Sequence, residues 1–222
     1  GGAAYFHDYR AVRDKARTLL LQKASHDFDV IHYITGQYTV RVVGMGGLDV
    51  YGGERPNDLK CDECEERDNC PDYAGGQRKK TKGFCCYRQE VGCEDHSMVM
   101  MELEGGIRSS YMQCHYTPEV SWRNYLFIGE KGSVEALQDG SVRVRTRKYN
   151  TRKTDRDFTY AEAVYHEGDT RGGHGGADPL MIGEVLDYFI EGKTPRVAPL
   201  DGRMAVAVGV GGAESIRNGN QP

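Results

Sequence analysis

Hydrophobic residues recur at helical spacing near both ends of the chain, whereas they alternate with polar residues in the middle. The helical spacing predicts helices within 5–35, over 178–190 and over 201–219. Within the first range, Ser25 is expected to cap a second, short helix that ends at Gly36. The chain is therefore expected to begin and end with helices.

The alternating pattern of the middle region predicts β-strands separated by tight turns. The segments with this pattern are 38–43, 97–104, 107–116, 125–128, 133–137, 141–147 and 158–165. Gly105-Gly106 and Asp139-Gly140 are typical of hairpins, and successive hairpins make neighbouring strands antiparallel. We predict an α+β, two-layer domain with an open, mainly antiparallel sheet of about six strands and helices at both chain ends.

The composition is that of a folded protein, since 38% of the 222 residues are hydrophobic and 28% are charged. The formal net charge is −4, which excludes the strong positive field of a nucleic-acid-binding protein. No apolar run is long enough to span a membrane, and no signal-peptide pattern opens the sequence. We therefore expect a cytoplasmic chain with neither a membrane nor a nucleic acid as partner.

A long excursion over 44–96 interrupts the strand pattern and contains most of the seven cysteines. Such a long segment is usually functional or is held by something other than a hydrophobic core. Its five candidate ligands for a structural zinc ion are Cys61, Cys64, Cys70, Cys85 and Cys86. The spacing fits no standard zinc module, so plain reduced thiols are the alternative, and disulfides are least favoured.

The sequence contains no fingerprint of a dinucleotide-binding domain. That fingerprint is a Gly-x-Gly-x-x-Gly turn between a strand and a helix, followed by an acidic residue. The glycine-rich stretches 44–47 and 209–212 fail this spacing, and the second lies within a helical pattern. We expect no cofactor-binding residue in this chain.

Several segments together carry a family resemblance through their order and spacing over nearly all of the chain. They are 19–30 (LLLQKASHDFDV), 127–134 (FIGEKGSV), 172–180 (GGHGGADPL) and 213–219 (AESIRNG). In this arrangement the chain resembles the C-terminal domain of the Gfo/Idh/MocA family, the relatives of glucose-fructose oxidoreductase and inositol dehydrogenase. The resemblance implies that residues 1–222 form a substrate-binding and oligomerisation domain. It also implies an N-terminal Rossmann domain, absent from this chain, that binds NAD or NADP.

The resemblance implies that the segment from Gln22 to His26 contains catalytic and substrate-binding residues. Oxidation of a carbinol needs a group that accepts the hydroxyl proton, and His26 is the candidate catalytic residue. Many relatives have an aspartate where this chain has Gln22, which can orient a substrate hydroxyl but cannot hold a proton. Proximity to a helix N-terminus would favour a neutral His26 imidazole. Alternatively, His26 is a capping or core histidine without a catalytic role. Lys23 is either a substrate contact or a solvated surface lysine.

Three further residues are candidate substrate contacts. Tyr9 and Arg10 precede the histidine segment in a region that contributes to the pocket in relatives, although an ordinary amphipathic helix surface would have the same pattern. His174 lies between two glycine pairs just before a predicted helix, where a histidine is rarely part of a core. A solvent-exposed loop is the alternative there.

The leading hypothesis is the substrate-binding half of an NAD(P)-dependent oxidoreductase that acts on a sugar or polyol. The resemblance further implies a homo-oligomer formed through the sheet face. A second hypothesis is a non-catalytic carbohydrate-binding or assembly module. A third is a glycosidase of the same superfamily, in which bound NAD⁺ transiently oxidises the sugar.

Overall fold

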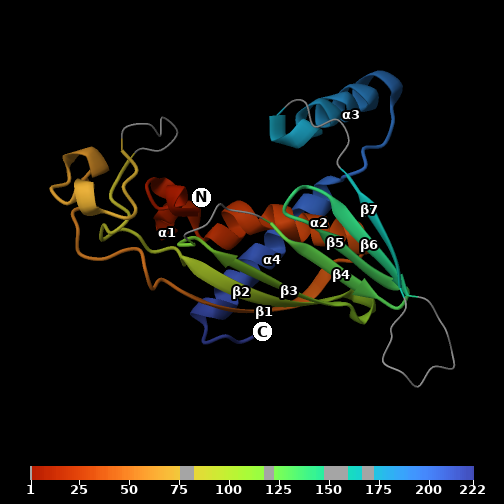
Figure 1. The fold of residues 1–222 in the computed structure, drawn as a ribbon, viewed down its shortest axis with the longest axis horizontal. Helices are drawn as coiled ribbons and strands as arrows, with labels where there is room; N and C mark the ends of the chain where they lie inside the picture. Colours follow the sequence, from red (N-terminus) through yellow and green to blue (C-terminus); the bar gives the residue numbers. More distant parts are fainter. Residues whose placement is uncertain (1, 76–82, 118–122, 148–159, 167–172) are drawn as a thin grey trace. The chain divides into compact units, whose positions relative to one another are not determined.

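The computed structural model describes residues 2–75, 83–117, 123–147, 160–166 and 173–222. The chain divides into two compact units, one formed by residues 1–120 and 197–222 and the other by residues 121–196 (Figure 1). The described residues contain seven strands, in a three-stranded and a four-stranded sheet, instead of about six in one sheet. All neighbouring strands are antiparallel, which confirms the predicted α+β class.

The sheet of the first unit has the order β1-β2-β3, with β1 at Thr39–Gly47, β2 at His96–Leu103 and β3 at Arg108–Cys114. Gly105 and Gly106 have φ angles of 68° and 80°, so the hairpin between β2 and β3 uses the left-handed conformation that glycine adopts without strain. In the ladder of β2 and β3, Val99 lies opposite Tyr111 and Ser97 lies opposite Gln113.

The helices of the first unit are α1 (Arg13–Ala16), α2 (Ser25–Thr35) and α4 (Pro199–Arg217). Short 3-10 turns occupy Gly2–Tyr5, Tyr9–Ala11, Cys61–Glu63, Arg67–Asn69 and Glu104–Gly106. A π-helical turn, Leu20–Ala24, runs directly into α2, so Ser25 has helical angles and the prediction that it caps the helix was wrong. Gly36 does end α2, with a φ of 65°.

Helix α4 packs closely against β1 and against the π-helical turn because glycines remove side chains at the contacts (Figure 1). A Cβ atom on Gly44 would lie 2.5 Å from the carbonyl oxygen of Gly212, and one on Gly209 would lie 2.9 Å from that of Leu20. Both distances are too short for any real Cβ contact. The glycine-rich stretches are thus packing contacts between backbones, consistent with their failure to match a dinucleotide fingerprint.

The second unit contains the sheet β4-β5-β6-β7 and one long helix. The strands span Tyr125–Gly129, Gly132–Ala136, Val142–Arg147 and Tyr160–Tyr165. A 3-10 turn at Gly173–Gly176 precedes α3 (Ala177–Glu191), which ends at Gly192 with a φ of 66°. Among the residues with known placement, no helix combines the length and apolarity needed to cross a bilayer.

Candidate functional site

The ring of Tyr5 brings together two of the residues predicted to contact substrate. The guanidinium carbon of Arg10 lies 4.6 Å from the ring centroid, and Nζ of Lys23 lies 4.9 Å from it. Asp8 fixes Arg10 by accepting two hydrogen bonds of 2.9 Å from Nε, and this pairing raises the pKa of Arg10. The ring of Tyr5 therefore has two cations against it, Arg10 from the same segment and Lys23 from the π-helical turn.

Polar side chains at every second position follow the inward face of β3 and continue one residue past its end, at Tyr111, Gln113 and His115. The imidazole of His115 meets the ring of Tyr5 edge to face, with the centroids 5.7 Å apart. The phenol oxygen of Tyr111 lies 3.1 Å from Oδ2 of Asp27 on α2 and 3.4 Å from Oε1 of Gln113. We call this continuous surface the polar wall, and its members are Tyr5, Arg10, Lys23, Asp27, Tyr111, Gln113 and His115.

Several polar atoms of the wall and its surroundings are buried without a hydrogen-bond partner among the described residues. They are Nε2 of Gln113, Nε2 of His115 and Oγ of Ser97, which faces Gln113 across the ladder. Gln113 and His115 are only 8% and 7% exposed. Buried polar atoms are normally satisfied by protein, water or ligand, so these atoms mark a place where an ordered water or a bound molecule would complete the hydrogen bonding.

Burial sets the charge of the histidine in the wall. It lowers the pKa of His115 from 6.5 to about 4, although the charge of Asp95 works in the opposite direction. Asp95 is itself fully buried and accepts backbone N–H groups of Asp49, Val50 and Tyr51 at 2.8–3.1 Å. Despite burial, these bonds and that from His96 leave the pKa of Asp95 lowered. His115 is therefore a neutral hydrogen-bonding group near pH 7.

The predicted catalytic residue, His26, is the second residue of α2 and is exposed. It directly precedes Asp27 of the wall, while Gln22 and Lys23 lie half-buried one turn earlier in the π-helical turn. Because that turn continues into α2, His26 does not face the free N-terminal amides of a helix, and our electrostatic argument for a neutral imidazole does not apply. Its role as proton acceptor remains a prediction.

Two other candidate substrate residues are not joined to the wall by the described contacts. Tyr9 lies in the 3-10 turn after Asp8 and is 50% exposed. His174 belongs to the second unit, has a φ of 53°, and places Nδ1 2.8 Å from Oδ1 of Asp178. Their contact with substrate stays a prediction.

The five candidate zinc ligands line one small cavity of about 20 Å³, together with Arg67, Asp72 and Tyr73. Within the part of the chain that the structure describes, no three histidine, cysteine or carboxylate side chains stand in a ready metal-binding arrangement. All seven thiols are free. The cavity gathers the predicted cysteines, and the zinc ion itself remains a prediction.

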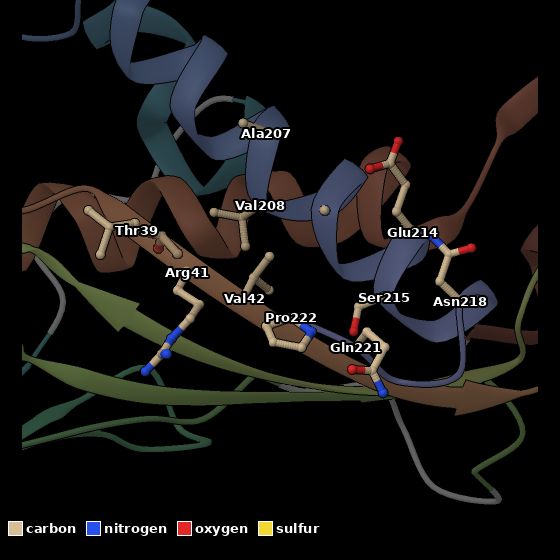
Figure 2. A pocket seen from close by; sticks show the side chains of 12 residues that line it. Thr39, Arg41, Val42, Ala207, Val208, Glu214, Ser215, Asn218, Gln221 and Pro222 are labelled. Atoms are coloured by element: carbon tan, nitrogen blue, oxygen red, sulfur yellow. The ribbon is translucent and has the colours of Figure 1, made fainter.

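A larger groove of about 410 Å³ lies between β1 and α4 (Figure 2). Its charged lining residues are Arg41 and Glu214, and Arg41 is already paired with Glu102 at 2.6 Å. The hydroxyl of Ser215 accepts the backbone N–H of Gly44 at 2.9 Å and so belongs to the packing of α4. Because Arg41 is already paired and Ser215 serves the packing of α4, we do not assign chemistry to this groove.

Sequence reasoning missed most of the wall, namely Tyr5, Asp27, Tyr111, Gln113 and His115. A signal was present in β3, where polar residues occupy the inward positions. The adjacent strand β2 has the ordinary pattern at Val99, Met101 and Leu103, which are buried and apolar. Polar residues on the buried face of a strand are unusual enough to mark a candidate site.

The family of this chain follows from its match to known protein families. A family described as "Oxidoreductase family, C-terminal alpha/beta domain", that of Gfo/Idh/MocA, matches residues 2–222. The chain belongs to this family. The match confirms the resemblance seen in the sequence, and it identifies the described units as the C-terminal part of Gfo/Idh/MocA proteins.

Individual relatives of this Gfo/Idh/MocA domain agree with that assignment. YteT of Bacillus subtilis (strain 168), which is named as an oxidoreductase, is 25% identical over 230 residues, covering 87% of this chain and 51% of YteT. An oxidoreductase domain protein from Kribbella flavida is similar in structure, with a TM-score of 0.66, 17% identity, and coverage of 95% of this chain and 52% of that one. A levoglucosan dehydrogenase in complex with NADH and levoglucosan gives a TM-score of 0.64, 16% identity, and coverage of 95% and 51%. The chain spans about half the length of these relatives, and the two structures show the fold alone.

Proposed function

We propose that this chain is the substrate-binding and oligomerisation half of an NAD(P)-dependent oxidoreductase that acts on a sugar or polyol. The observation that carries the proposal is the polar wall, in which three separate segments bring together an aromatic ring, two cations and several hydrogen-bonding groups. Sugars are bound by this combination of planar hydrogen-bonding groups and an aromatic surface.

The unpartnered atoms of the wall support a hydroxyl-rich substrate. The amide Nε2 of Gln113 is a donor, the Ser97 hydroxyl donates or accepts, and the neutral imidazole of His115 offers one nitrogen of each kind depending on its tautomer. A sugar hydroxyl both donates and accepts, so it matches such a mixed set. An apolar ligand would leave these buried atoms unsatisfied at a cost of about 1–3 kcal/mol each.

In the proposed reaction, His26 accepts the proton of a substrate hydroxyl while a hydride leaves the carbon atom that bears this hydroxyl. The nicotinamide cofactor, when bound, supplies the acceptor for that hydride. Gly44, Gly209 and Gly212 serve the packing of α4 against its neighbours, and we place the cofactor on a separate Rossmann domain. Gln22 would orient the substrate, Lys23 and Arg10 would bind its oxygens, and Tyr9 and His174 would extend the site.

The outer face of the first sheet supports the proposed homo-oligomer. Its exposed side chains include a group of methionines, Met45, Met98, Met100 and Met112, that are 54–68% exposed. Exposed apolar clusters of this kind mark protein interfaces.

We further propose that the assembled enzyme works in the cytoplasm.

The test uses the full-length protein that contains these residues, a panel of sugars and polyols, and both NAD⁺ and NADP⁺. Formation of reduced cofactor in proportion to oxidised sugar is the expected result. Release of a sugar from a glycoside without net change of cofactor would replace this proposal with the glycosidase. Binding of sugar without either reaction would replace it with the non-catalytic module.

A further inference from the structure

The cysteine-rich excursion has little regular structure to hold it in place. Residues 44–47 belong to β1 and His96 to β2, and between these strands its described parts contain only two short 3-10 turns and two isolated bridges, one between Arg55 and Arg88 and one between Lys60 and Phe84. Segments of this length that lack a core of their own are commonly fastened by a disulfide or a metal ion. The seven cysteines form no disulfide, and five of them line one cavity.

We propose that Cys61, Cys64, Cys70 and Cys85 bind one zinc ion in the cavity that they line. The cavity volume of about 20 Å³ fits a single ion or water and is too small for an iron–sulfur cluster. Four sulfur ligands favour zinc over harder cations such as magnesium and calcium. A cysteine has one side-chain torsion, and rotation about it would direct the Sγ atoms of these lining residues toward a central ion.

The fifth cysteine of the cavity, Cys86, belongs to the core instead of the metal site. Its side chain is 1% exposed and packs with Phe6, Leu19, Tyr51 and Val91. Cys85 is not a member of this core cluster, so the two neighbouring cysteines have different surroundings. Excluding Cys86 leaves the four ligands of a tetrahedral site.

Backbone and charged groups already surround the thiols as they would surround thiolates. The backbone N–H groups of Ala74 and Tyr87 donate to the sulfurs of Cys61 and Cys85. Such bonds stabilise metal-bound sulfur and fix its orientation. Zinc with four thiolates carries a net charge of −2. Arg67 and Asp72 line the same cavity, and Arg55, which is paired with Glu66, acts electrostatically on Cys64 and Cys85. Binding of zinc releases the thiol protons to water.

The zinc site would fasten the beginning of the chain as well as the excursion. Phe84, next to Cys85, pairs with His7 through its backbone N–H at 3.1 Å and its carbonyl at 2.7 Å. His7 precedes Asp8, which orients Arg10 of the polar wall. The zinc ion is thus a structural support behind the wall, and this inference does not depend on the activity proposed above.

Metal analysis of purified, reduced protein tests the proposal. We expect about one zinc per chain in the wild type and in C86A, and an at least tenfold lower zinc content in C85S and C64S. C114S is a further control, because Cys114 lies on β3 and does not line the cavity. A loss of zinc in C86A equal to that in C85S would overturn the ligand assignment.

A second measurement keeps the proposal testable if the serine variants do not fold. Wild-type protein treated with a chelator and then titrated with Co²⁺ should develop the absorption bands of tetrahedral cobalt–thiolate, saturating at about one equivalent. Chelation should also lower the melting temperature, and zinc should restore it. Absence of both zinc and cobalt–thiolate bands, or one equivalent of iron in place of zinc, would overturn it.

Discussion

The phenol oxygen of Tyr111 lies 3.1 Å from Oδ2 of Asp27, the residue that follows His26 in α2. This hydrogen bond joins the middle of β3 to the helix that carries the proposed catalytic residue. Asp27 is only 5% exposed, so the bond helps to stabilise a buried carboxylate. The position of His26 relative to the sheet therefore depends in part on Tyr111.

Replacing Tyr111 with phenylalanine should lower the free energy of unfolding by about 1.5–3 kcal/mol, the usual range for a hydrogen bond to a charged group. The ring contact with Phe28, at a centroid distance of 5.1 Å, is preserved in this variant. Urea unfolding measures the change. S110A, at the exposed neighbouring position of β3, is the control and should unfold as the wild type does.

Replacing His26 with alanine in the full-length protein should lower kcat at least tenfold, because removal of a general base costs about a factor of 100 or more in many enzymes. Y33F, at an exposed position of the same helix, should retain wild-type turnover. The two variants are compared under steady-state conditions with saturating substrate and cofactor. Wild-type turnover in H26A would remove His26 from the mechanism.

The buried His115 predicts a specific loss of stability in acid. Its pKa is about 4 in the folded protein and 6.5 when exposed, so between these values the unfolded state binds more protons than the native state. The contribution of neutral His115 is fully present above pH 6.5 and is lost progressively as the pH falls toward 4, by about 3 kcal/mol in total.

H115Q cannot titrate and should show a shallower decline over this pH window, measured as the free energy of unfolding at several pH values. His32, whose pKa is also lowered by burial, contributes equally to both proteins and cancels in the comparison. Parallel pH dependence of the two proteins would show that His115 is not protonated on unfolding as expected.

Arg88 links the excursion to the start of the chain and is completely buried. It donates to the carbonyls of Phe6, Cys85 and Asp8 at 2.6–2.9 Å and pairs with Glu90 at 2.9 Å. R88M should lower the free energy of unfolding by about 3–5 kcal/mol, because it leaves these buried acceptors unsatisfied. R41M, which breaks an exposed pair with Glu102, should cost at most about 1 kcal/mol.

Two glycines of α4 should respond to alanine with opposite signs. A Cβ on Gly209 would meet the backbone of Leu20 and Leu21 at 2.9–3.1 Å, so G209A should destabilise the protein by about 1–3 kcal/mol. A Cβ on Gly202 would have nothing within 4 Å, and G202A should gain up to about 1 kcal/mol from helix propensity. Thermal unfolding of both variants measures the difference, and equal effects would contradict the close contact.

Local signals were sufficient to predict much of the fold. The helix end at Gly36 and the hairpin at Gly105-Gly106 depend on conformations that glycine adopts most easily, so a short stretch of sequence determines them. The supposed cap at Ser25 failed for a nonlocal reason. Leu20 is fully buried and packs against Gly209 of α4. This packing holds Leu20–Ala24, the residues before Ser25, in a helical turn that their local sequence alone does not require.

The candidate site could be predicted only in part, for the same physical reason. The segment from Gln22 to His26 was found through a resemblance, and of its residues Lys23 contacts the ring of Tyr5 in the polar wall. The wall itself arises from contacts between residues far apart in sequence, such as Tyr5 with His115. Neither the periodicity nor the spacing of residues in the sequence predicts such a contact. The polar residues on the inward face of β3, where apolar residues are usual, did indicate a candidate site.

The exposure of His26 has a consequence for affinity. A sugar lying on the polar wall beside this residue would keep its opposite face in water. Binding sites for small molecules usually bury about 70–90% of the ligand surface, and a single wall covers much less than that. Sugar binding to this chain alone should therefore be weak, and most of the binding free energy should come from the second surface that closes over the substrate.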